Sequence, residues 1–114
     1  MNITVTKEQL IQGITISERL TGKKESLPVL SCILLDAQEG FSLRATNLEA
    51  GVNVVVRSEI HERGTIAVPA TIFSQTIRSI GGDKITLTSD EGNLVITARG
   101  TKTLIKAVPH DEFP

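Results

Sequence analysis

Two segments of the chain carry apolar residues at helical spacing. The first begins at Thr6 and ends near Leu20, before the stop signal Thr21-Gly22, and the second begins at Pro69 and ends at Gly81-Gly82. Polar residues occupy the opposite side of each segment, so we predict two amphipathic helices. Their apolar positions are Leu10, Ile11 and Ile14 in the first helix, and Ile72, Phe73, Ile77 and Ile80 in the second.

Strands are predicted where the apolar residues alternate with polar ones or form short runs. These segments are residues 3–5, 29–37, 41–46, 52–56, 66–68, 84–88, 94–98 and 104–108. Glu39-Gly40, Glu91-Gly92 and Gly100 mark tight turns between them. The polar stretch from Arg57 to Arg63 is predicted to lie outside the strands.

The two halves of the chain repeat the same order of elements. At an offset of 63, Ile3 and Val5 fall on Ile66 and Val68, and at an offset of 52 Glu39-Gly40 falls on Glu91-Gly92. We therefore predict a single α+β domain over residues 1–114, built from a duplicated βαβββ unit with repeats at about 1–60 and 61–114. Both helices should pack on one side of an antiparallel sheet, with their polar faces together.

Composition narrows the classes of function. The 114 residues carry 12 basic and 13 acidic side chains, which excludes the strongly basic surface of an autonomous nucleic-acid binder. A single cysteine excludes an internal disulfide and a multi-cysteine zinc site. The chain shows neither a signal peptide nor a membrane-spanning run, so we expect a cytoplasmic protein with no membrane partner.

The candidates for chemistry are isolated from one another. His61 and His110 lie in polar stretches without a second ligand, and Cys32 lies in an apolar run typical of a buried thiol. The carboxylate pairs Asp90-Glu91 and Asp111-Glu112 fit solvated turns. We therefore expect no catalytic residue, no metal and no cofactor, and predict that the protein is not an enzyme.

Four segments carry a resemblance to a known family. They are Leu27-Pro28-Val29-Leu30, Ala45-Thr46-Asn47-Leu48-Glu49, Gly64 to Ala70, and Val108-Pro109 with Glu112-Phe113-Pro114. In this order, on a duplicated βαβββ frame, the chain resembles the N-terminal domain of the bacterial DNA polymerase III beta subunit, the sliding clamp. The resemblance covers essentially the whole chain.

The resemblance implies a ring around double-stranded DNA. Subunits of the family carry three such domains, and two subunits form a homodimer with helices lining the hole. The ring acts as a processivity factor in DNA replication, because it tethers DNA polymerase III without sequence-specific DNA contacts. The implied partners of the full-length clamp are the polymerase and the clamp loader, whose peptide pocket lies outside this chain.

The resemblance also implies residue roles. Lys24, with Lys23 beside it, and Arg78 match basic DNA-contacting positions, although each could equally be a solvated surface charge. Subunit closure would use the second helix and the last strand. The implied interface residues are Ile72, Thr76, Thr103 and Ile105, and the alternative for Ile105 is the sheet core.

Two questions stay open at this point. The helices are nearly neutral, because Lys7 and Arg19 offset Glu8 and Glu18 in the first one. This favours an alternative function, a clamp-fold protein–protein interaction module that does not encircle DNA. The chain also spans only the first of the family's domains, so it is either a fragment or a short protein that assembles from more copies.

Overall fold

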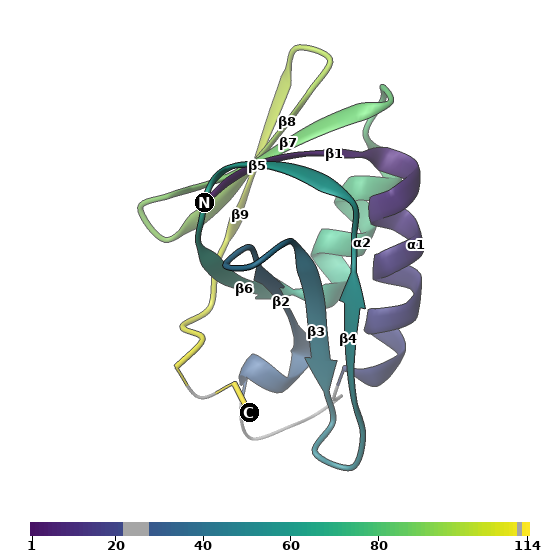
Figure 1. Cartoon of the computed structure of the whole chain (residues 1–114), viewed down its shortest axis with the longest axis vertical. Coiled ribbons are helices and arrows are strands. Elements are labelled where there is room, and N and C mark those ends of the chain that lie inside the picture. The colour runs from purple at the N-terminus through teal and green to yellow at the C-terminus, as the bar shows by residue number, and fades with distance from the viewer. Residues whose placement is uncertain (22–27, 112) are drawn as a thin grey trace.

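The computed structural model describes residues 1–21, 28–111 and 113–114, which form two α-helices, two short 3-10 helices and nine strands (Figure 1). Their bounds are β1 Asn2–Thr6, α1 Lys7–Ser17, η1 Glu18–Leu20, η2 Pro28–Ser31, β2 Cys32–Asp36, β3 Ser42–Thr46, β4 Gly51–Val55, β5 Ser58–Glu62, β6 Thr65–Pro69, α2 Ala70–Ser79, β7 Lys84–Asp90, β8 Asn93–Ala98 and β9 Thr101–Lys106. The α+β class and both helices confirm the prediction.

The helices begin and end where local chemistry dictates. The hydroxyl of Thr6 caps α1 by accepting a hydrogen bond from the amide of Gln9 at 3.2 Å. The η1 turn continues α1 to Leu20, as predicted. Helix α2 begins directly after Pro69 and ends where the amide of Ile80 donates to the carbonyl of Thr76 at 3.1 Å.

The strands form two antiparallel sheets instead of the single sheet that we predicted. One sheet has the order β5-β1-β7-β8-β9, and the other has the order β4-β3-β2-β6. The leading strand of each half pairs with the other half: β1 lies beside β7, with Ile3 opposite Leu87, and β6 lies beside β2, with Val68 opposite Ile33. Side-chain periodicity identifies a strand but not its partner, so this exchange was invisible in the sequence.

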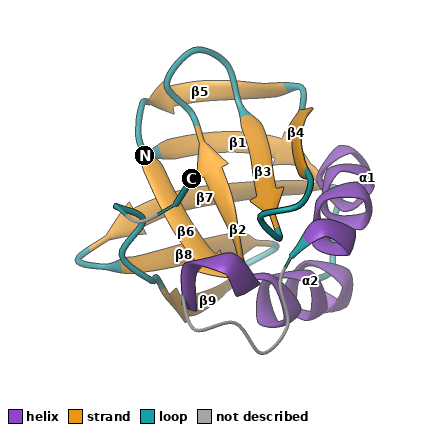
Figure 2. Ribbon diagram, turned by 90° about the horizontal axis from the view of Figure 1, so that it is seen from below, coloured by secondary structure: helices purple, strands orange, loops and turns teal. Residues whose placement is uncertain are grey.

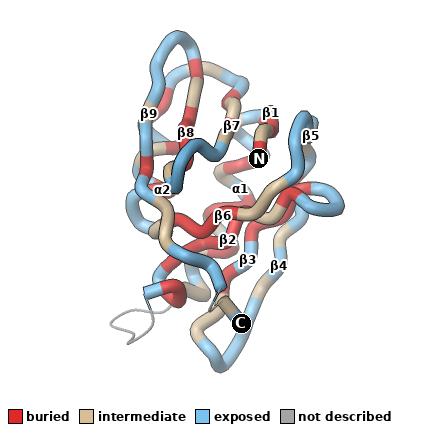
Figure 3. Tube along the Cα trace, turned by 90° about the vertical axis from the view of Figure 1, so that its left-hand side faces the viewer, coloured by how far each residue is buried: buried red, intermediate tan, exposed pale blue. Residues whose placement is uncertain are grey.

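One core joins the two sheets to the helices. All twelve apolar residues that overlay between the halves belong to it, and each is almost fully buried. They are Ile3, Val5, Leu10, Ile14, Ile33 and Leu35 in the first half, and Ile66, Val68, Phe73, Ile77, Ile85 and Leu87 in the second. Figure 3 shows buried residues gathered along β2 and β6 in the middle of the molecule.

Two elements differ from the sequence prediction. The predicted strand at residues 29–37 begins as the 3-10 helix η2 and becomes β2 only at Cys32, because an unbroken apolar run does not distinguish a strand from a buried helical turn. The polar stretch after Arg57 contains β5, an edge strand that pairs with β1. Charged side chains are typical of exposed edges, and only Ile60 of this strand packs on the core.

A second, smaller apolar cluster lies on the opposite face of β2. Cys32 and Leu34 belong to it, whereas Ile33 and Leu35 belong to the main core. The C-terminal segment covers this cluster, because Val108 forms a bridge with Ala67 of β6 and Phe113 packs nearby. The chain end is thereby held against the four-stranded sheet.

Candidate nucleic-acid interface

Helices α1 and α2 lie next to each other on the same side of the molecule (Figure 2). The exposed and half-exposed positions of the pair are mostly polar, with three basic and two acidic side chains over α1, η1 and α2. The surface that a clamp would turn toward DNA is therefore nearly neutral in its described part. Direct phosphate contacts from it must come from few residues.

Arg78 lies in the last turn of α2 and connects the two helices. Its Nε donates to the Ser74 hydroxyl at 3.0 Å, and its Nη2 donates to the Thr15 hydroxyl at 2.9 Å. The same Nη2 forms an ion pair with Glu18 Oε1 at 3.1 Å. The hydroxyl of Thr15 donates to the carbonyl of Ile11, which leaves its lone pairs for Arg78.

This network holds the guanidinium in one orientation but does not bury it. The Arg78 side chain is 42% exposed and the Glu18 side chain 33%. Arginine has five N–H donors, and the two on Nη1 make no hydrogen bond within the described part of the chain. A phosphate oxygen can therefore still reach Arg78, so the expectation for this residue is compatible with its geometry.

The other predicted basic residues, Lys23 and Lys24, lie outside the described residues. Sequence reasoning missed Glu18 and Thr15 as partners of Arg78, because their contact depends on how the helices pack. It also missed the exposed amides of Gln12 and Gln75, which occupy equivalent positions at the offset of 63. The repeat itself was the signal that could have identified this pair.

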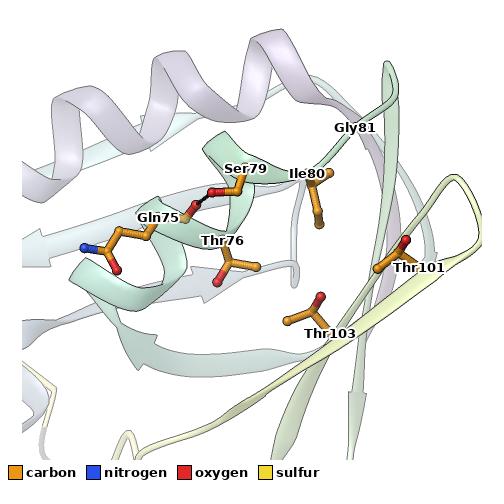
Figure 4. A pocket seen from close by; sticks show the side chains of 7 residues that line it. All are labelled: Gln75, Thr76, Ser79, Ile80, Gly81, Thr101 and Thr103. Atoms are coloured by element: carbon orange, nitrogen blue, oxygen red, sulfur yellow. Dashed lines mark hydrogen bonds between the residues drawn. The ribbon is translucent and has the colours of Figure 1, made fainter.

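A groove runs between α2 and β9, and two of the predicted interface residues meet there (Figure 4). Thr76 projects from the helix and Thr103 from the strand. The lining residues are Gln75, Thr76, Ser79, Ile80, Gly81, Thr101 and Thr103. Within the described ranges β9 is hydrogen-bonded to β8 alone, so its other edge offers backbone groups to a further strand.

The remaining interface candidates are exposed to different degrees. Ile72 is 48% exposed on α2, one turn before Thr76. Ile105 is only 4% exposed and belongs to the main core, because it lies opposite Leu94 on the inner face of the sheet. The core alternative thus describes Ile105 in this chain, and the exposed apolar residue of β9 is Leu104, at 61%.

The side chains that could act in catalysis or metal binding do not form a cluster in the described part of the chain. His61 Nε2 lies 3.0 Å from the Thr4 hydroxyl on an exposed sheet edge. Burial raises the pKa of the Cys32 thiol, although a hydrogen bond with Ser31 acts in the opposite direction. Over residues 1–21, 28–111 and 113–114, no group of three or more His, Cys, Asp or Glu side chains could hold a metal ion.

Within the part of the chain that the structure covers, no helix is both long and apolar enough to cross a membrane.

Sequence comparison and structure comparison both relate this chain to the same family of proteins. Residues 1–114 match the family DNA polymerase III beta subunit, N-terminal domain. The beta sliding clamp of Pseudomonas putida is 31% identical over 117 residues, which cover 100% of this chain and 32% of that protein. The beta sliding clamp of Micrococcus luteus is 22% identical and is covered over 37% of its length.

The solved structures that resemble this chain are also DNA polymerase III beta subunits. The DNA polymerase III beta subunit of Thermotoga maritima superimposes with a TM-score of 0.94 at 31% identity, over 99% of this chain and 31% of that one. The Caulobacter crescentus protein gives 0.91 at 25% identity, over 100% of this chain and 31% of its own. The chain thus spans about a third of the length of these relatives. It belongs to the DNA polymerase III beta subunit family, whose sliding clamps are processivity factors and not enzymes, and it corresponds to the N-terminal domain of that family.

Proposed function

We propose that this chain is one segment of a ring that encircles duplex DNA without sequence specificity and tethers the replicative DNA polymerase. The observation that carries the proposal is the helix pair, whose described surface is polar and nearly neutral and includes the partly exposed Arg78 in the last turn of α2. A sliding ring needs such a surface, because topology retains the DNA and strong phosphate contacts would slow the ring.

The domain organisation fits this role. The order β1-α1-β2-β3-β4 recurs as β6-α2-β7-β8-β9, with β5 between the two. We propose that residues 1–114 form a single clamp domain with repeats at about 1–60 and 61–114. In such a domain the two helices come from different repeats and face the same side.

Self-association would use the groove between α2 and β9. Thr76 and Thr103 lie within it, Ile72 lies at the exposed end of α2, and the open edge of β9 supplies backbone hydrogen bonds. Leu104 adds an exposed apolar contact on the outer face of the strand. Ile105 would support this strand from the core.

The remaining assignments follow from the family. DNA contacts would come from Arg78 together with Lys23 and Lys24. The full-length clamp would form a homodimer, to which the polymerase and the clamp loader would bind. The protein would act in the cytoplasm. Binding of the polymerase and of the clamp loader would belong to the assembled protein and not to the isolated chain.

The test separates topological retention from ordinary binding. The native protein is loaded onto nicked circular DNA and followed by gel filtration, before and after the DNA is cut once. A ring should co-elute with the circle and be lost from the linear product. Retention on linear DNA, or no retention on the circle, would contradict the proposal.

A second function is favoured by one specific observation, the ion pair between Arg78 and Glu18. Since this pair lowers the positive charge of the helix surface, the chain could instead be an interaction module that does not encircle DNA. In that case the unchanged protein would not be retained on circular DNA, and Arg78→Glu would cause no further change. A protein partner would then be captured through β9 and lost when the groove is altered.

A further inference from the structure

The guanidinium of Arg78 is oriented by more partners than it needs. Ser74 accepts from Nε and Thr15 accepts from Nη2, and these two bonds approach from the same helix and from the neighbouring helix. Together they define both the position and the plane of the group. Glu18 is therefore not required to aim Arg78.

The contribution of Glu18 is instead electrostatic. Its Oε1 lies 3.1 Å from Nη2 of Arg78, and both side chains are partly open to solvent. A phosphate group that binds the free N–H donors of Arg78 must come within several ångströms of this carboxylate. Like charges at such distances repel even in water, so Glu18 opposes the contact that Arg78 makes.

We propose that the negative charge of Glu18 weakens phosphate binding by Arg78, so that the helix pair holds duplex DNA loosely. This inference rests on the proposed function, because it assumes that DNA faces the helices. It adds a residue whose effect has the opposite sign: removing the charge of Glu18 should strengthen DNA binding, whereas removing that of Arg78 should weaken it.

The experiment measures how the chain binds a short duplex of random sequence at about 50 mM salt, where phosphate contacts are strong. Amide chemical shifts of α1 and α2 report the dissociation constant. Glu18→Gln should tighten binding roughly threefold, the effect of one charge about 6 Å from a phosphate in water. Glu18→Asp keeps the charge and should bind as the unchanged chain does.

Two controls separate a local effect from a general one. Glu39→Gln makes the same change in net charge on the exposed turn between β2 and β3, and should alter binding much less than Glu18→Gln. In an Arg78→Gln background, Glu18→Gln should give no gain beyond that of Glu39→Gln. Thermal unfolding of each variant checks that the helices remain packed.

The outcomes are distinct. Threefold tightening that disappears in the Arg78→Gln background supports the proposal. If the unchanged chain binds DNA and Glu18→Gln binds equally or more weakly, or tightens equally in both backgrounds, the role of Glu18 is refuted while the DNA-facing function stands. If neither the unchanged chain nor Glu18→Gln shifts the helix signals, both the inference and the DNA-facing surface are refuted.

Discussion

Arg78 and Thr15 occupy equivalent positions of the two repeats, and they touch each other. Their numbers differ by the offset of 63 that superimposes the halves, and Arg78 Nη2 donates to Thr15 Oγ1 at 2.9 Å. Thr15 lies in the last turn of α1 and Arg78 in the last turn of α2. The contact therefore joins the same part of the two equivalent helices, and the one arginine of α2 makes it.

Loss of the Arg78 contacts should destabilise the helix pair modestly. Arg78→Gln removes the bonds to Thr15 and Glu18 at a partly exposed site, so we expect a loss of about 1 kcal/mol in the free energy of unfolding. Urea denaturation measures it. Lys102→Gln, an exposed position on β9, is the matched control, and an equal loss in both variants would contradict the structural role of Arg78.

Charge reversal on the surface that we propose to face DNA should affect retention of the native protein. In the native protein, Lys24→Glu combined with Arg78→Glu should speed dissociation from linear DNA and slow loading, since two phosphate contacts become repulsive. Loading assays on nicked circles measure both effects. Unchanged loading and sliding in the double variant would refute these residue assignments.

Truncation of the two apolar residues at the end of β9 should affect different properties of the protein. Ile105→Ala creates a cavity in the main core and should cost about 2–4 kcal/mol of unfolding free energy. Leu104→Ala changes an exposed side chain and should cost about 0.5 kcal/mol or less, while weakening self-association of the native protein. Denaturation and sedimentation measure the two effects. Equal losses of stability would show that the register of β9 is wrong.

Gly64 should tolerate no side chain. A Cβ atom at this position would lie 2.7 to 2.9 Å from the backbone and Cβ of Met1, so Gly64→Ala forces strand β1 or its neighbour to shift. We expect a loss of about 2 kcal/mol in unfolding free energy. Gly51→Ala is the control, because its nearest contact would be an ordinary 3.6 Å, and it should lie within about 0.5 kcal/mol of the unchanged chain.

Cys32 should be unreactive in the folded chain. It is buried under the C-terminal segment, and this burial raises the pKa of its thiol, so the reactive thiolate is scarce at neutral pH. A disulfide reagent should modify it only after denaturation. Because the folded pKa is the higher one, alkaline solution should favour unfolding and speed modification. Rapid labelling of the native chain at neutral pH would contradict the structure.

Much of the local structure was predictable from the sequence. The spacing of Leu10 and Ile14 indicated a buried helix face, and both residues are fully buried. Gly40 and Gly92 marked equivalent turns, and both adopt the positive φ that glycine permits, at 88° and 81°. Strand β5 escaped prediction because an exposed edge strand needs only one apolar contact, which Ile60 makes.

The site was only partly predictable. Thr76 and Thr103 came from the resemblance, and the groove brings them together. The alternation near Leu104 and Ile105 was ambiguous, because two adjacent apolar residues fit either register. Pairing with Leu94 and Val95 resolves it, since side chains opposite each other share a face of the sheet.

The sequence by itself determined which segments are helices and strands, and that the two halves share one pattern, because periodicity is a local property of the chain. Only the tertiary structure decided that β1 and β6 exchange sheets and that Glu18 reaches Arg78. Both depend on contacts between residues about thirty positions or more apart, and such contacts are selected by the packing of the whole core and not by any local signal.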